Sequence, residues 1–201
     1  MAETLANRDD VIAFSLPIDY WDNYGWRDTF ASPDHTARQR AYADRLPNRR
    51  VYTPQVVING RIDVIGTRET EILNALTSEK ATSRSTVPID VSLQTSNLLI
   101  KIGEAPESLG DINADIWILP YHSRIQSVEV EAGENAGRTL NYANVVVGMT
   151  RLGSYSGKPV TIEYGMPDSE IGSPDACAVL VQLRDAGPII GAHRVDMEDA
   201  S

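Results

Sequence analysis

The stretch that decides the fold is Val51-Tyr52-Thr53-Pro54-Gln55-Val56-Val57-Ile58-Asn59-Gly60-Arg61. Its apolar residues 56–58 are all β-branched, which suits a buried strand. Asn59-Gly60 supplies the two positive-φ positions of a tight hairpin, and residues 61–65 alternate as the returning strand. Pro54 stands at the first strand position, which a sheet tolerates, and a cis bond before it costs only about 0.5–1 kcal/mol. The stretch therefore predicts a proline-led β-hairpin.

Length and composition are those of a globular protein. The chain has 201 residues, which is one large domain or two small ones, and 42% are apolar, enough for a sizeable core. It contains no run of about 18 apolar residues, so we expect no membrane span. The first residues lack a basic start and an apolar run, so no secretory signal is expected in the chain as written.

The acidic charge is distributed unevenly. A net charge of −10 argues against general nucleic-acid binding. Residues 1–80 carry 10 basic and 12 acidic side chains, a net charge of −2, whereas residues 81–201 carry 8 and 16, a net charge of −8. The two parts therefore look like different modules.

The first module follows a clear order of elements. Residues 11–16 form a continuous apolar run, typical of a strand buried on both faces. Ser32-Pro33-Asp34 is a helix start, with an N-cap serine and a proline in the first turn, and predicts a helix over 33–46. The hairpin follows, and helical spacing of apolar residues then predicts a helix over 69–79.

The second module has a different pattern of apolar and polar residues. Residues 81–86 are small and polar and are predicted to be a linker. After Val87 apolar and polar residues alternate through seven or eight short segments separated by turn residues, which is the pattern of an antiparallel β-sandwich. We therefore divide the chain into residues 1–80, a linker at 81–86, and residues 87–201.

Few residues carry recognisable chemistry. The aromatic loop Asp19-Tyr20-Trp21 directly follows the predicted strand 11–16, at the sheet edge where α/β proteins bind ligands. His35 is expected at the surface. Cys177 lies in an apolar strand and is read as a buried small hydrophobe, and as the only cysteine it excludes an internal disulfide. His122 and His193 have no ligand at metal spacing, so no metal or cofactor is expected.

The chain resembles one bacterial family. The order strand, helix, proline-led strand, hairpin strand, helix is that of a thioredoxin-like domain from its second strand onward. The segments that carry the resemblance are Ile18-Asp19-Tyr20-Trp21-Asp22-x-x-Gly25-Trp26, Arg38-Gln39-Arg40-Ala41-Tyr42, the opening stretch 51–61, and later Gly137-Arg138-Thr139-Leu140. Together they are similar to the thioredoxin-like, predicted secreted family called domain of unknown function 1223. The resemblance implies a periplasmic or secreted location and a cis-proline at Thr53-Pro54.

The family pattern also begins earlier than this chain. It has a first strand and a Cys-x-x-Cys-Pro motif before the first helix, and no residue here can carry that redox site. Without the first strand, residues 11–16 and 55–58 would each present an unpaired edge, and such edges invite pairing with another chain. We expect either that the natural protein is longer and begins upstream of Met1, or that a truncated form closes the gap by forming a homodimer or by rearranging.

The predicted fold class is α+β, an incomplete thioredoxin-like α/β domain followed by an antiparallel β-sandwich. Two functions are open. The first is a non-catalytic module that binds a protein or peptide partner and has no catalytic residue of its own. The alternative is a fragment of an envelope thiol–disulfide oxidoreductase whose Cys-x-x-Cys lies upstream of Met1. For the oxidoreductase, the candidate substrate groove consists of Tyr52, Thr53, Pro54, Asp19, Tyr20 and Trp21. For the binding module, the sandwich and the loop Asp19-Tyr20-Trp21 are predicted to hold the partner.

Overall fold

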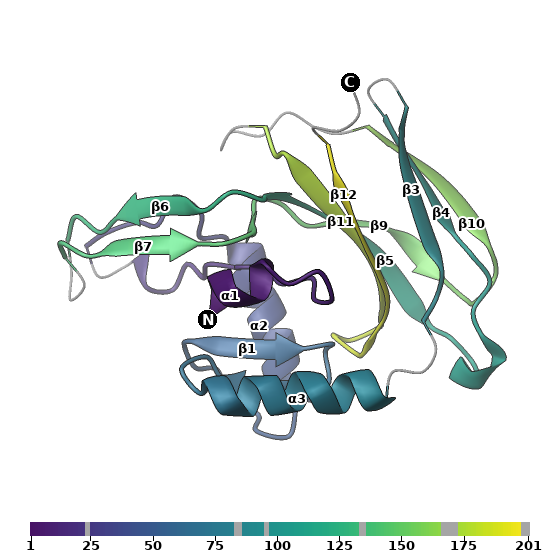
Figure 1. Ribbon diagram of the computed structural model, residues 1–201, viewed down its shortest axis with the longest axis horizontal. Helices are drawn as coiled ribbons and strands as arrows, with labels where there is room; N and C mark the ends of the chain where they lie inside the picture. The colour runs from purple at the N-terminus through teal and green to yellow at the C-terminus, as the bar shows by residue number, and fades with distance from the viewer. Residues whose placement is uncertain (23–24, 83–85, 95–96, 133–135, 166–172, 198–201) are drawn as a thin grey trace.

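The computed structural model describes residues 1–22, 25–82, 86–94, 97–132, 136–165 and 173–197 (Figure 1). The helices are α1 (Ala2–Ala6), α2 (Pro33–Arg45), α3 (Glu69–Thr82) and the short 3-10 helix η2 (Glu107–Leu109). The strands are β1 (Gln55–Ile58), β2 (Ile62–Ile65), β3 (Ile89–Gln94), β4 (Asn97–Ile102), β5 (Ala114–His122), β6 (Gln126–Glu129), β7 (Thr139–Tyr142), β8 (Val145–Val146), β9 (Thr150–Tyr155), β10 (Val160–Gly165), β11 (Ala176–Leu183) and β12 (Ile189–Asp196).

Two antiparallel sheets form the larger part of the molecule. One has the order β12-β11-β5-β8, with β9 also paired to β5, and the other has the order β10-β4-β3 (Figure 1). The largest core cluster joins the two sheets, with fully buried side chains such as Ile100 of β4, Ile116 of β5 and Val179 of β11. Cys177 lies in this core, and burial raises the pKa of its thiol to about 11. It is a packing residue, as the sequence predicted.

The proline-led hairpin is confirmed. β1 and β2 pair antiparallel, with Val56 opposite Val64, and the turn residues Asn59 and Gly60 have φ values of 49° and 66°. The Thr53–Pro54 bond is cis. A two-stranded hairpin is marginal by itself, so it needs a packing partner. That partner is α3, whose Ile72 is fully buried in a small cluster with hairpin side chains.

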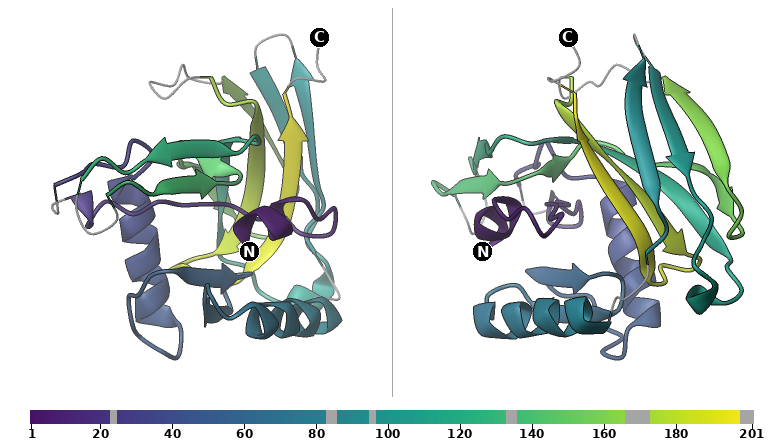
Figure 2. Two further views of the ribbon diagram at one scale, coloured as in Figure 1. Left: turned by 60° about the vertical axis from the view of Figure 1, so that its left-hand side comes forward. Right: turned by 45° about the vertical axis from the view of Figure 1, so that its right-hand side comes forward.

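The start of α2 is also as predicted. The Ser32 hydroxyl accepts a hydrogen bond from the Asp34 N–H at 3.2 Å, and Pro33 occupies the first helical turn. This cap satisfies one of the free N–H groups at the helix start. Helix α2 contacts the five-stranded sheet, since Arg38 donates to Gln182 of β11 at 2.9 Å. Figure 2 shows the helix next to the hairpin unit, which is formed by β1, β2 and α3.

The predicted fold class was wrong. The described residues form mostly β-strands in several antiparallel sheets, and they contain no thioredoxin-like α/β core. Residues 11–16 were predicted to be a strand in the same sheet as residues 55–58. They form only an isolated bridge, from Ser15 to Val145 of β8, while β1 and β2 form a sheet of two strands.

The physical reason lies in what residues 11–16 contact. The Ser15 N–H donates to the Asn144 oxygen, and the Val146 N–H donates to the Ser15 oxygen, both at 3.0 Å. Phe14 packs its ring edge-on against Tyr121 of β5, with ring centres 5.2 Å apart. The segment therefore packs Phe14 and Leu16 on the five-stranded sheet and is not paired with β1.

The division into residues 1–80 and 87–201 stays a prediction, and residues 83–85 of the predicted linker lie outside the described residues. A buried polar network connects α2 with β11. Gln182 is 2% exposed, its Nε2 donates to the Gly187 oxygen at 2.7 Å and the Tyr42 hydroxyl at 3.1 Å, and its Oε1 accepts from Arg38 at 2.9 Å. Loss of this amide would leave several buried groups without partners.

Replacing Gln182 by Leu should lower the free energy of unfolding by about 1–3 kcal/mol, because a buried carbonyl and hydroxyl lose their hydrogen-bond donor. Urea unfolding monitored by circular dichroism measures the change. The matched control is Gln94→Leu at an exposed position of β3, which should change stability by less than about 0.5 kcal/mol. Equal effects of the two substitutions would contradict the structural role of the network.

Candidate functional site

A cavity of about 630 Å³ lies between residues 11–16 and β1. Every residue of both segments lines it. Figure 2 shows α1 and the chain that follows it lying above β1, with α3 on the opposite side of β1. The cavity therefore separates the hairpin unit from the part of the chain that is attached to the five-stranded sheet.

The edge of β1 that faces away from β2 has unpaired backbone groups. The Gly66 N–H donates to the Pro54 oxygen at 2.8 Å, and the Arg61 N–H donates to the Ile58 oxygen at 2.9 Å. Hydrogen-bonded pairs alternate along an antiparallel ladder, so Gln55 and Val57 direct their N–H and C=O groups away from β2. Among the described residues, no hydrogen bond reaches these four groups.

The opposite wall has a second unpaired edge. Ala13 and Ser15 face β8, since the Ala13 oxygen accepts from the Asn144 side chain at 2.9 Å and Ser15 makes the two bonds given above. Extended backbone presents its polar groups to alternate sides. Ile12, Phe14 and Leu16 therefore present theirs away from β8, and no described residue bonds to them.

The side chains around the cavity are mainly apolar and belong to two core clusters. On the hairpin side the cluster contains Leu5, Ile58 and Ile72, with Ala13 and Val56 packed against it. On the sheet side the cluster contains Leu119 and Leu180, with Phe14, Leu16 and Ile189 packed against it. The cavity thus lies between the two clusters, so it has apolar side chains on both of these sides.

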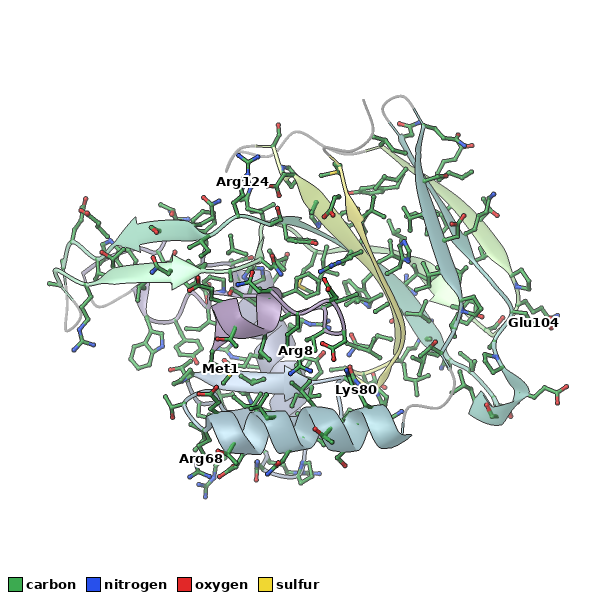
Figure 3. The ribbon with its side chains drawn as sticks, viewed as in Figure 1. Met1, Arg8, Arg68, Lys80, Glu104 and Arg124 are labelled. Carbon is green, nitrogen blue, oxygen red and sulfur yellow. The ribbon has the colours of Figure 1, made fainter. Side chains whose placement is uncertain are left out.

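The charged groups at one end of the cavity are already paired. Lys80 at the end of α3 forms an ion pair with Asp10, which also pairs with Arg8 at 2.8 Å (Figure 3). Glu79 lies 3.6 Å from Arg61. These pairs leave the cavity without an unmatched charge at this end.

His35 also lines the cavity, and its predicted surface position was wrong. It is 3% exposed, and its Nδ1 lies 2.8 Å from the Pro17 oxygen. A carbonyl only accepts, so Nδ1 carries the proton. Burial lowers the pKa of the imidazole, which keeps the ring neutral.

The predicted groove residues are brought together only in part. Gln39 of α2 connects the loop that contains Tyr20 with the loop that contains Tyr52. Its Oε1 accepts from the Tyr20 hydroxyl at 3.0 Å, and its Nε2 donates to the backbone oxygen of Tyr52 at 2.9 Å. Asp19 is engaged with Thr36, whose hydroxyl donates to it at 2.5 Å. Of the six predicted residues, Pro54 alone is a cavity-lining residue, and Trp21 and Thr53 are exposed.

Sequence reasoning missed Gln39, whereas the unpaired edges of residues 11–16 and 55–58 were expected. Nothing in the sequence distinguishes Gln39 from other helix residues, since a polar residue on a helix is ordinary. The continuous apolar run 11–16 did give a signal, because it indicated a segment buried on both faces. Its true neighbours are β8 on one side and the cavity on the other.

The described residues offer neither a metal site nor a membrane-spanning helix. No three His, Cys, Asp or Glu side chains gather closely enough to hold a metal ion. None of the described helices has both the length and the apolar character needed to cross a bilayer.

A family model described as a protein of unknown function, DUF1223, matches residues 1–182. The X-ray crystal structure of protein AGR_C_4864 from Agrobacterium tumefaciens is similar, with a TM-score of 0.78 and 27% identity over 100% of this chain and 86% of that chain. A crystal structure of hypothetical protein PH1083 from Pyrococcus horikoshii has a TM-score of 0.25 and 12% identity, over 58% of this chain and 96% of that one. No curated protein matches the chain.

Tyr52 tests the contact between the loop that precedes β1 and the returning strand β2. Its hydroxyl donates to Asp63 at 2.8 Å, and burial together with this carboxylate raises the pKa of the phenol to about 12. The Asp63→Asn substitution should lower the pKa of Tyr52 toward 10, because it removes the negative charge that opposes ionisation. Titration of ¹³C-tyrosine resonances measures the change.

Tyr121 is the internal control for this titration. Its pKa is also raised to about 12, mainly by burial, so Asp63→Asn should leave it unchanged. In the parent protein both phenols have a higher pKa in the folded state than in the unfolded state. Stability should therefore fall as the pH rises from about 10 to 12. A Tyr52 resonance that titrates near pH 10 before substitution would contradict the contact.

Proposed function

This chain belongs to the DUF1223 family, whose description names no function, and we propose that it acts as a non-catalytic module that binds an extended segment of a protein or peptide partner. The binding site is the cavity between residues 11–16 and β1. The observation that carries the proposal is the pair of unpaired backbone edges facing a cavity of about 630 Å³. Its size falls within the range of about 300–1,000 Å³ that is typical of binding sites.

The chemistry of the lining supports a polypeptide as the bound molecule. Unpaired N–H and C=O groups on both walls require a partner that offers donors and acceptors in alternation, which an extended backbone does. The apolar side chains between them add affinity without requiring charge. The acidic net charge of the chain argues against a nucleic acid.

The alternative, a thiol–disulfide oxidoreductase, has no support from the residues of this chain. Its single cysteine, Cys177, is buried, and burial raises the pKa of its thiol. Such a thiol is a poor nucleophile, because the thiolate is the reactive form. The periplasmic or secreted location and the upstream Cys-x-x-Cys that the family resemblance implied stay predictions.

A display library of random heptapeptides tests the proposal. We expect selected peptides to bind the parent protein and to lose at least tenfold in affinity for the Ala192→Trp variant. Ala192 is exposed but lines the cavity, so an indole at this position takes up space that the peptide needs. Isothermal titration calorimetry measures the affinities.

The matched control is Ala136→Trp, an exposed alanine that does not line the cavity. This variant should bind the same peptides as the parent protein does. Both variants should retain the circular dichroism spectrum of the parent. If no selected peptide distinguishes Ala192→Trp from Ala136→Trp, the cavity is not the binding site and the proposed function is wrong.

A further inference from the structure

We infer that Arg151, Arg184 and Ser154 form a binding site for a phosphate group on the outer face of the five-stranded sheet, which is the face turned away from the sheet β10-β4-β3. The site surrounds Asp115 of β5. This residue lies six positions before Tyr121, so it is about 20 Å from the end of β5 that pairs with β8. None of the four site residues lines the cavity, so the inference does not depend on the proposed function.

Three neighbouring strands bring these side chains together. β5 pairs with β11 on one side and with β9 on the other (Figure 1). Ile116 is buried between the two sheets, so Asp115, the residue before it, points to the outer face. Ser154 of β9 is directly opposite Asp115, and Arg184 follows the last residue of β11. The carboxylate of the middle strand therefore has side chains of both neighbouring strands beside it.

An irregularity in β9 places Arg151 on the same face. The register of β9 with β5 shifts next to Trp117, where β9 contains one extra residue. Residues three positions apart in a regular strand point to opposite faces, so Arg151 and Ser154 share a face only because of this bulge. Bulges re-aim side chains in this way and are common next to functional sites.

The two guanidinium groups share one carboxylate oxygen and one hydroxyl. Arg151 donates to Asp115 Oδ1 from Nε at 2.9 Å and from Nη2 at 2.7 Å, and Nε of Arg184 lies 3.5 Å from the same oxygen. The Ser154 hydroxyl oxygen accepts from Arg151 at 2.6 Å and from Arg184 at 3.0 Å. These contacts hold the two guanidinium groups beside each other.

The four side chains have more positive charge and more donors than they use among themselves. In the part of the chain that the structure describes, Asp115 is the only carboxylate within ion-pair distance of either arginine, so one positive charge is in excess. A guanidinium group has five N–H donors. Arg151 makes three side-chain hydrogen bonds and Arg184 makes one. Since the two side chains are 42% and 45% exposed, an anion can reach the remaining donors from solvent.

A phosphate group matches this set of donors. Guanidinium groups bind phosphate oxygens through paired, charge-assisted hydrogen bonds, and two of them can contact different oxygens of one phosphate. The Ser154 hydroxyl accepts from both arginines and still has its own hydrogen to donate. The acidic net charge of −10 disfavours a nucleic acid, so the ligand is free phosphate or a small phosphate monoester.

A purely structural role explains the second arginine less well. One arginine is enough to neutralise Asp115, and a second arginine at the same oxygen adds repulsion between like charges. Exposed ion pairs also stabilise a fold very little. A bound dianion would balance the excess charge and use the donors that remain.

Titration of the full chain with inorganic phosphate and with glycerol 3-phosphate tests the inference, followed by NMR of the arginine Nε–H signals. We expect the signals of Arg151 and Arg184 to shift together and to saturate with one dissociation constant. Tighter binding of glycerol 3-phosphate would identify an organic phosphate as the ligand, and tighter binding of the inorganic ion would identify free phosphate. Sodium chloride at equal ionic strength should not produce the shifts.

Four variants locate the binding. Arg184→Gln should weaken phosphate binding at least about tenfold, because it removes charged donors, and Ser154→Ala should weaken it about threefold. Arg184→Lys keeps the charge but loses the planar fork, so it should also bind more weakly than the parent protein. The matched control is Arg194→Gln on β12, which removes the same charge from an exposed arginine outside the site and should leave the affinity unchanged. Circular dichroism checks that each variant is folded.

Three results would overturn the inference. Equal weakening by Arg184→Gln and Arg194→Gln would show that phosphate responds only to the net charge of the protein. Shifts that grow with concentration and never saturate would show that no site exists. Acetate that binds as tightly as phosphate would show that the arginines do not select a phosphate group.

Discussion

The arrangement of the whole amino-terminal part depends on one short piece of backbone pairing, between Ser15 and β8. The two backbone hydrogen bonds of Ser15, with Asn144 and Val146, attach residues 11–16 to the five-stranded sheet. Phe14 then packs on Tyr121, and Leu16 joins the same cluster. Because the segment is fixed on this side, its other edge is left facing β1 across a cavity.

The hairpin unit is attached to the same sheet by different contacts. Asn59 accepts a hydrogen bond from Ile189 of β12, while Gln182 of β11 holds α2 through Arg38 and Tyr42. Both walls of the cavity are thus fixed to one body, and the cavity is formed before anything binds. Unpaired strand edges are costly and prone to aggregation, so proteins usually cover them. The proposed binding of an extended partner segment would cover both edges.

Local structure could be read from the sequence, and long-range pairing could not. The hairpin at Asn59-Gly60 and the Ser32 cap of α2 are encoded by residues a few positions apart, and both are as predicted. The thioredoxin-like fold was inferred from the order of elements, and order does not determine which strands are neighbours. The partner of residues 11–16 is about 130 positions away, at Val145. For the same reason Gln39 could not be recognised from the sequence, since its contacts with Tyr20 and Tyr52 depend on two loops that only the fold brings together.

Amide hydrogen exchange of the free protein, measured residue by residue by NMR, tests the central claim that the outer edge of β1 is unpaired. Val56 and Ile58 bond to β2, whereas Gln55 and Val57 face the cavity. We expect slow exchange at Val56 and Ile58 and exchange at least tenfold faster at Gln55 and Val57. Equal protection of all four amides would show that this edge is already paired, and would contradict the account.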